Sequence, residues 1–304
     1  AAYCSNLSNE NKNTVELNTT ASEGRGIELS VKSKEMAADK MRKNVIAEEE
    51  KKENLKKISD NQKKASDIQQ SNVPKAAVSF NTSVNQSQNP TYIVNKLKSI
   101  GSSMQVIVVT SDNWYDTKGT FEAYEKVSGI WKQVFSPRTC ALGGHGISTD
   151  RHEGDGTTPA GKYTFGTAFG YGGNPGTSMP YKFSSPDDYW VSGKTPDTYN
   201  VWITRSGGPD PAWGPDGDGF ERLNEPVVYK YGIVINFNTG DGGSTKVMGN
   251  GSGIFFHCAR PNMTPTAGCV ALPEGDVVNV LRWMKPSSNP VIVIGQKDWA
   301  IKNM

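Results

Sequence analysis

The chain has 304 residues, which is enough for one large domain or two small ones. Its 33 basic and 31 acidic residues give a formal net charge of +2, and this near balance argues against a dedicated nucleic-acid binder. No apolar run approaches the roughly 18 residues of a transmembrane helix, and four cysteines are too few for a disulfide scaffold.

The first hundred residues differ in composition from the rest of the chain. Of the 32 glycines only Gly24 and Gly26 precede residue 101, and only two aromatic residues occur before residue 91. Such a segment cannot bury enough apolar surface to offset the entropy lost on folding. The sequence therefore predicts that residues 1–100 form an N-terminal tether and no packed domain.

The tether itself has internal variation. Glu and Lys recur at helical spacing over about 28–70, with a thin apolar stripe, and this indicates a helix within an otherwise disordered segment. The stripe is too broken for a coiled coil. Residues 101–296 are long enough for a core of their own, and 297–304 are expected to be a C-terminal tail.

Cys4 raises the question of a lipid anchor. A bacterial lipoprotein carries an acylated Cys at its mature N-terminus, followed by a polar tether, and Cys4 precedes such a stretch. Tyr3 is a poor residue before an acylated Cys, where a small side chain is expected. The sequence therefore favours an unmodified Cys4 over a lipid anchor.

The domain after residue 100 is expected to be mainly β. Its β-branched and alternating runs are bounded by Gly, Pro, Asp and Asn, which is typical of strands joined by turns. One helical apolar pattern, over 275–284, indicates a packed helix, and a second helix is allowed for. The expected strands are 106–109, 120–125, 131–135, 199–204, 228–237, 253–257 and 291–294.

Candidate chemistry centres on His257 and Cys269. His257 ends an apolar strand, and Phe255 and Phe256 before it should anchor that strand on both faces of the sheet. Cys269 follows Gly268 and is expected to precede a helix directly, where the helix N-terminus would favour the thiolate. A Cys nucleophile with a His base is a common arrangement for acyl transfer, although a buried Cys often serves packing alone.

Other candidate sites are weaker. His145 and His152 lie near acidic residues, but their spacing fits no usual zinc pattern, so a solvated loop is the preferred interpretation and no metal is expected. Asp216 and Asp218 resemble a calcium loop that lacks the Glu at its twelfth position, which favours a Gly-rich turn. Three tryptophans either line a groove for a glycan or a peptide, or pack in the core: Trp190, Trp202 and Trp213.

Three separated segments resemble the L,D-transpeptidases, the YkuD-type family. The first is Glu-Gly-Asp-Gly-Thr-Thr-Pro-Ala-Gly-Lys-Tyr at 153–163, the second Gly-Ser-Gly-Ile-Phe-Phe-His at 251–257, and the third Thr-Ala-Gly-Cys at 266–269. The resemblance covers roughly residues 103–295 and implies a β-sandwich with one or two packed helices. It says nothing of residues 1–100.

The resemblance implies a cysteine acyltransferase of the bacterial cell wall. Cys269 would attack a peptidoglycan stem peptide with loss of D-alanine, and His257 would be its base. The backbone carbonyl of Cys258 would orient the imidazole. Backbone N–H groups of Gly268 and Cys269 would bind the oxyanion. No cofactor or metal is implied. The partners would be peptidoglycan stem peptides and carbapenem-type inhibitors, and the location the extracytoplasmic cell envelope, secreted or tethered. Substrate contacts are expected at Thr266, Ala267, Tyr199, Asn200 and Ser252.

Two departures from the family pattern concern substrate contacts. Ala267 stands where many relatives carry a second His, and Ala271 where many carry Arg or Asn. Two alternatives remain at this point. An L,D-carboxypeptidase would use water as the acceptor, and a wall-binding module would have lost activity, which the intact Cys269 and His257 speak against. A disulfide between Cys140 and Cys258 is left open.

Overall fold

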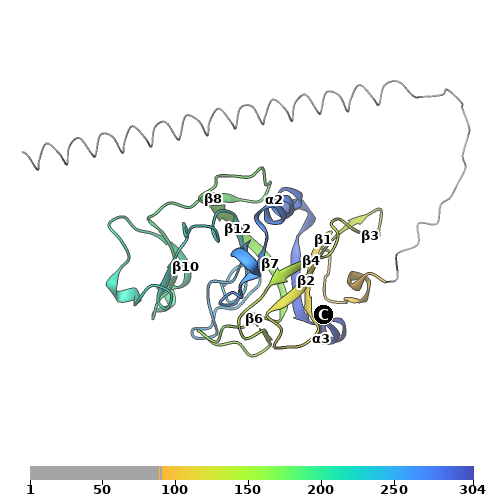
Figure 1. Cartoon of the computed structure of the whole chain (residues 1–304), viewed down its shortest axis with the longest axis horizontal. Helices are drawn as coiled ribbons and strands as arrows, with labels where there is room; N and C mark the ends of the chain where they lie inside the picture. The colour runs from red at the N-terminus through yellow and green to blue at the C-terminus, as the bar shows by residue number, and fades with distance from the viewer. Residues whose placement is uncertain (1–88, 90) are drawn as a thin grey trace, which may run out of the picture. The chain divides into compact units, whose positions relative to one another are not determined.

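The computed structural model describes residue 89 and residues 91–304, which belong to one unit, Val84–Met304. The described part is mainly β with two α-helices, α2 (Glu274–Trp283) and α3 (Lys297–Asn303), and the expected fold class is confirmed (Figure 1). The helix expected over about 28–70 and Cys4 lie outside the described residues. Within the described residues, no helix combines the length and the apolar character needed to cross a bilayer.

One large mixed sheet forms the body of the domain. Its strands pair in the order β1-β15-β7-β12-β13-β14-β4-β2-β3, with β8 added beside β7. Because β1 also pairs with β2, the sheet closes on itself, and the layers of the expected sandwich are parts of one closed sheet. The strands are β1 (Gln105–Ser111), β2 (Lys118–Val127), β3 (Ile130–Gln133), β4 (Arg138–Ala141), β7 (Gly161–Gly170), β8 (Tyr181–Phe183), β12 (Gly232–Ile235), β13 (Phe255–Cys258), β14 (Val270–Leu272) and β15 (Val291–Gln296).

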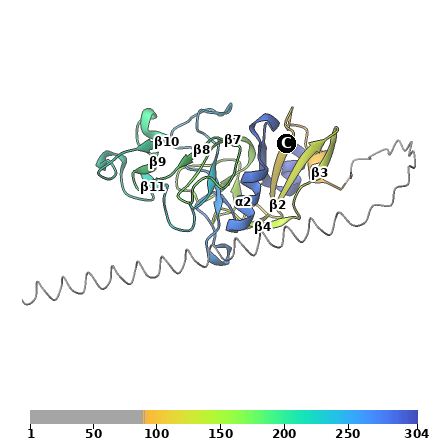
Figure 2. The same ribbon diagram turned by 90° about the horizontal axis from the view of Figure 1, so that it is seen from above.

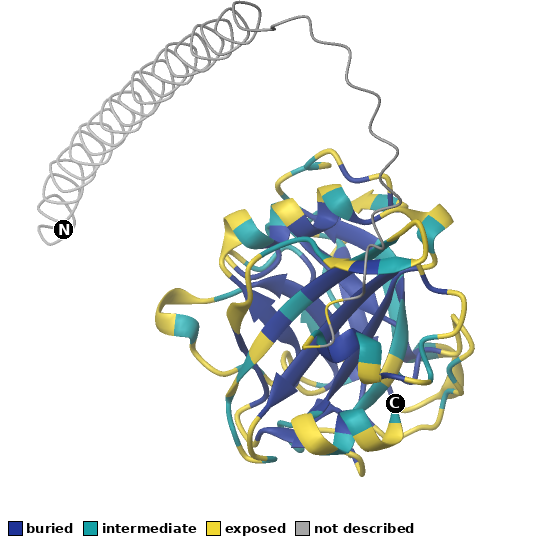
Figure 3. Cartoon of the chain, turned by 90° about the vertical axis from the view of Figure 1, so that its right-hand side faces the viewer, coloured by how far each residue is buried: buried dark blue, intermediate teal, exposed yellow. Residues whose placement is uncertain are grey.

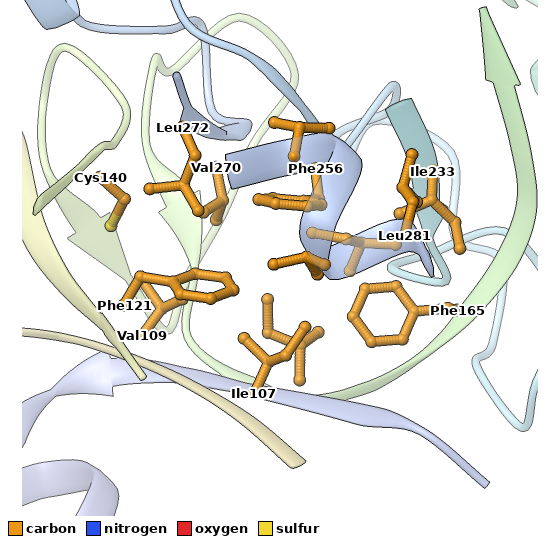
Figure 4. Packing of buried hydrophobic residues seen from close by; sticks show 14 of the residues in the cluster. Ile107, Val109, Phe121, Cys140, Phe165, Ile233, Phe256, Val270, Leu272 and Leu281 are labelled. Carbon is orange, nitrogen blue, oxygen red and sulfur yellow. The ribbon is translucent and has the colours of Figure 1, made fainter. Parts of the chain in front are cut away.

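The core lies inside this sheet and includes one face of α2. Residues of β1, β2, β13 and β15 join Val277, Val280 and Leu281 of α2 in one apolar cluster. Figure 4 shows side chains from the surrounding strands pointing toward Leu281, and Phe121 stacks on Phe256 with ring centroids 5.5 Å apart. Figure 3 shows dark blue over much of the strands that line this core; β1 and β13 are buried throughout, whereas β2 and β7 also carry exposed or half-buried residues. Because side chains alternate along a strand, Phe256 and Cys258 of β13 face this core.

The two ends of the described chain meet on the outer face of β1 and β15. The 3₁₀-helix η1 (Ile93–Lys96) and α3 cover alternate residues of these strands, such as Val108 and Val293. We expected residues 1–100 to be tether and 297–304 to be a tail. The structure differs, because Ile93, Val94 and Leu97 are buried and α3 is an ordered helix whose Ala300 is fully buried.

Two smaller sheets complete the fold. β9 (Asp188–Ser192) lies between β10 (Tyr199–Thr204) and β11 (Phe220–Arg222), at the opposite end of the unit from α3 in Figure 1 and Figure 2. β5 (Ile147–Ser148) pairs with β6 (Thr158–Pro159), and the loop between them runs beside the nucleophile motif. Short 3₁₀-helices occupy four loops: η2 (Pro196–Thr198), η3 (Pro211–Trp213), η4 (Pro261–Met263) and η5 (Pro286–Ser288).

Candidate active site

Parallel pairing of β13 with β14 brings the Cys and the His motifs together. Phe256 pairs with Val270, so Cys269 lies beside Phe255 at the start of the ladder. The Phe255 N–H donates to Sγ of Cys269 at 3.3 Å, and Sγ donates to the Gly253 carbonyl at 3.3 Å. His257 is two residues beyond Phe255, so its side chain leaves the same face of the strand.

His257 is held in one orientation. Its Nδ1 lies 2.8 Å from the Cys258 carbonyl oxygen, which can only accept, so Nδ1 carries the proton and Nε2 is left as an acceptor. The ring also packs edge-on against Tyr229, with centroids 5.4 Å apart. Burial lowers the pKa of His257 to about 4, so the imidazole is neutral at pH 7 and able to take a proton.

The resting sulfur is a thiol. Burial, together with the nearby Glu221 carboxylate, raises the pKa of Cys269 to about 12. The expectation that Cys269 directly precedes a helix is wrong, because β14 intervenes and α2 begins only at Glu274. A helix dipole acts within about one turn of its end, so it does not favour a thiolate here. Cys269 and His257 are therefore both neutral at pH 7.

Both side chains line one cavity of about 320 Å³. The cavity wall is rich in charged side chains, and it includes Ser252, Thr266 and Ala267, three of the five residues expected to contact substrate. The charged residues are Arg151, Glu153, Asp216, Asp218, Glu221, Glu225 and Arg260. No group of three or more His, Cys, Asp or Glu side chains suited to a metal ion occurs within the described part of the chain.

Thr266 shapes the turn that carries Cys269. Its Oγ1 accepts from the Gly268 N–H at 3.1 Å and donates to the Cys269 carbonyl at 2.7 Å. The structure thus differs from the expected oxyanion role of Gly268, since that N–H is already bonded within the turn. Gly268 has φ +143° and a Cβ there would lie 2.7 Å from the Thr157 carbonyl, so the close approach of the neighbouring loop requires glycine.

Tyr199 and Asn200 lie behind the site. The Tyr199 hydroxyl donates to Glu153 at 2.7 Å and accepts from the Gly251 N–H at 3.0 Å. Oδ1 of Asn200 accepts from the Gly253 N–H at 3.0 Å. Neither residue lines the cavity that holds Cys269; their side chains fix the backbone segment whose Gly253 carbonyl meets the sulfur.

Two charged residues at the site were missed by the sequence reasoning. Glu221 of β11 lies against Gly253, where a Cβ would be 2.7 Å from Oε1, and accepts from the Tyr229 hydroxyl at 2.5 Å. Burial raises the pKa of Glu221 to about 7. Arg151 lies against Gly268 on the other side. Isolated charges in loops or at a short strand carry no periodic signal, so only the fold reveals their placement.

The other sequence candidates take structural roles. His145 and His152 are exposed, and the Asp155 carboxylate between them caps the backbone N–H groups of His152 and Thr157 at 2.8 Å. Asp216 forms an ion pair with Arg222 at 3.3 Å, next to a turn at Gly217 with φ +83°. All three described cysteines are unpaired, namely Cys140, Cys258 and Cys269, so the disulfide left open between the first two does not form.

The tryptophans pack, and two of them also line a second cavity. Trp213 belongs to an apolar cluster with Tyr189 and Phe220. Trp190 packs edge-on against Phe255, and Trp202 lies under the Lys182 ammonium, 4.1 Å from the ring centroid. Trp190 and Trp202 line a larger cavity of about 1610 Å³, which shares Arg151 with the cavity of Cys269.

Comparison with known proteins gives one family. Residues 105–293 match the model of the YkuD family, the L,D-transpeptidase catalytic domain, and this match spans the closed sheet, α2 and both motifs. No curated protein and no solved structure matches the chain. The matched segment makes up more than half of the sequence and includes both Cys269 and His257. The chain therefore belongs to the L,D-transpeptidase catalytic domain family.

Proposed function

We propose that this protein is a peptidoglycan L,D-transpeptidase that forms an acyl-enzyme on Cys269. The observation that carries the proposal is the neutral pair of Cys269 and His257, which line one cavity while Nδ1 of His257 is tied to the Cys258 carbonyl. The family acts on peptidoglycan stem peptides through a cysteine, which supplies the class of substrate.

The first half-reaction transfers a peptide acyl group to sulfur. Nε2 of His257 takes the thiol proton as Sγ attacks the carbonyl of the third stem residue. The C–N bond to D-alanine breaks, the departing amine receives that proton, and a thioester remains on Cys269. Because the thiol pKa is about 12 and the imidazole pKa about 4, proton transfer accompanies attack instead of preceding it.

The second half-reaction releases the acyl group to an amine. The side-chain amine of a neighbouring stem attacks the thioester carbonyl and gives a proton to Nε2 of His257. The C–S bond breaks, an amide forms, and His257 returns the proton to Sγ, which leaves as the thiol. Carboxylates are numerous in the cavity wall, and their charge suits an incoming ammonium group. Since this acceptor is part of the cell wall, we further propose that the protein works at the extracytoplasmic cell envelope.

Products from a disaccharide-tetrapeptide test the proposal. The full chain should release D-alanine, carry a thioester adduct on intact-mass analysis, and yield a cross-linked dimer. Cys269→Ala should give none of these. Tripeptide without dimer would instead indicate a carboxypeptidase that uses water, and the absence of adduct and product from the parent would leave a wall-binding module.

A further inference from the structure

The guanidinium of Arg151 occupies a slot between two glycines beside the nucleophile. Arg151 comes from the loop after β5 and is 7% exposed. A Cβ at Gly251 would lie 2.5 Å from Nε, and a Cβ at Gly268 would collide with Nη1. Gly268 directly precedes Cys269, so the positive charge lies about one residue from the nucleophile, in the wall of its cavity.

The fold uses only part of this guanidinium. Nη1 donates to the Thr157 carbonyl, and the Asp155 carboxylate lies 3.8 Å from it. Nε is buried with no hydrogen-bond partner in the part of the chain that the structure describes. A purely structural arginine would satisfy this donor, because a buried N–H without a partner is destabilising.

No nearby carboxylate among the described residues accepts a hydrogen bond from Nε of Arg151. Oε1 and Oε2 of Glu153 accept from Ser252 at 3.0 Å and from Tyr199 at 2.7 Å. Asp155 is bonded by backbone N–H groups of its own loop. Arg151 therefore keeps one unused donor and a positive charge in the cavity wall, although its guanidinium also lies over the Phe237 ring, 5.8 Å from the centroid. A guanidinium fork is suited to a carboxylate.

We propose that Arg151 binds the terminal carboxylate of the donor peptide and so selects donors that end in a free acid. The inference rests on the proposed function. In a donor whose penultimate carbonyl meets Cys269, the terminal carboxylate lies one residue beyond the attacked carbon. The Arg151 guanidinium lies against Gly268, the residue before Cys269, so its distance from the sulfur is also about one residue. Arg151 is thus a specificity-determining residue for the leaving group.

The substrate-side test needs no variant. The full chain is mixed with the disaccharide-tetrapeptide, as the free acid or with its terminal carboxyl converted to a carboxamide, and the rate of thioester formation is followed by intact mass. The acid should acylate Cys269 about 10- to 100-fold faster, the range expected for loss of one charge-assisted hydrogen bond. Equal rates for the two donors would overturn the proposal.

Variants test whether Arg151 causes the preference for the free-acid donor. Arg151→Met should bring the ratio of the acid rate to the amide rate down to about one, while Arg151→Lys should keep part of the preference for the acid. Arg260→Met removes another cation from the same cavity wall and should keep the ratio of the two rates. An equal fall of Arg151→Met with both donors would contradict carboxylate binding and point to the oxyanion or to folding.

A binding measurement tests this inference independently of the proposed function. Cys269→Ala cannot be acylated, so calorimetry with the acid and the amide peptide reports recognition alone. If Cys269→Ala binds the acid more tightly than the amide, and the additional change Arg151→Met removes that difference, the inference is supported even if the parent proves inactive. Equal or absent binding of both peptides overturns it. An inactive parent that still prefers the acid overturns only the proposed function.

Discussion

The backbone N–H of Phe255 donates a hydrogen bond to the sulfur of Cys269 across 3.3 Å. Phe255 belongs to β13, which also carries His257 two residues later. The register of β13 against β14 therefore sets where Cys269 and His257 lie relative to each other. A β-strand between packed layers is a rigid support, which is what a base that must stay within hydrogen-bond reach of its nucleophile requires.

Replacing the base should slow acylation. We expect His257→Gln to reduce the acylation rate of Cys269 by about 10²–10⁴-fold, the typical contribution of a positioned general base. The parent should show an acid limb near pH 4, where His257 gains its proton, and the variant should lack it. His145→Gln and His152→Gln, at exposed loop positions, are the matched controls. A variant His257→Gln that acylates at the parental rate across pH 6–9 would refute the pair.

A carbapenem should label Cys269 alone. Cys140 is fully buried with its pKa raised to about 12, and Cys258 is buried with its pKa raised to about 11; neither lines the cavity. Intact-mass analysis should show one adduct that disappears in Cys269→Ala and persists in Cys140→Ala. Labelling that survives the loss of Cys269 would place the reactive thiol elsewhere.

Glu221 should suppress the thiolate. Its carboxylate raises the pKa of Cys269, so Glu221→Gln should lower that pKa and speed alkylation by iodoacetamide at pH 8–9, by about 10-fold for each pKa unit. The difference should vanish well below pH 7, where Glu221 itself is protonated. Asp218→Asn, in the same cavity wall, is the control. Identical pH profiles for the parent and Glu221→Gln would show that the carboxylate does not act on the sulfur.

The boundary of the folded unit can be tested by truncation. A chain that starts at residue 91 should unfold in urea with the free energy of the full chain. One that starts at residue 101 loses three buried side chains, Ile93, Val94 and Leu97, each contributing about 1.5–3 kcal/mol, and should be less stable by about 4 kcal/mol or more. Tryptophan fluorescence reports both transitions. Equal stability of the two chains would show that η1 contributes nothing.

Local patterns predicted the elements that carry the strongest signals. The β-branched run at 106–109 is the centre of β1, and the expected strand 199–204 is β10 to the residue. The expected strand 228–237 shrinks to β12, because Val227 has φ +73° and residues 226–230 form turns that bury Tyr229. β7 was missed since its Gly and Ala residues break the apolar alternation.

Long-range pairing explains what the sequence could not reveal. Closure of the large sheet depends on β1 meeting both β2 and β15, a strand nearly two hundred residues away, and no local pattern encodes that contact. The same holds for the site. Cys269 and His257 are near each other in sequence and were identified from their motifs, whereas Arg151 and Glu221 reach the cavity from separate loops and sheets.

The small sheet of β9, β10 and β11 is a second, separate support for the cavity that holds Cys269. The thiol and the imidazole come from the closed sheet, but Glu221 comes from β11 and the support for Gly253 from Asn200 on β10. Changes at Ser192, Phe220 or Glu221 would therefore alter the cavity wall while the register of β13 and β14 stays in place.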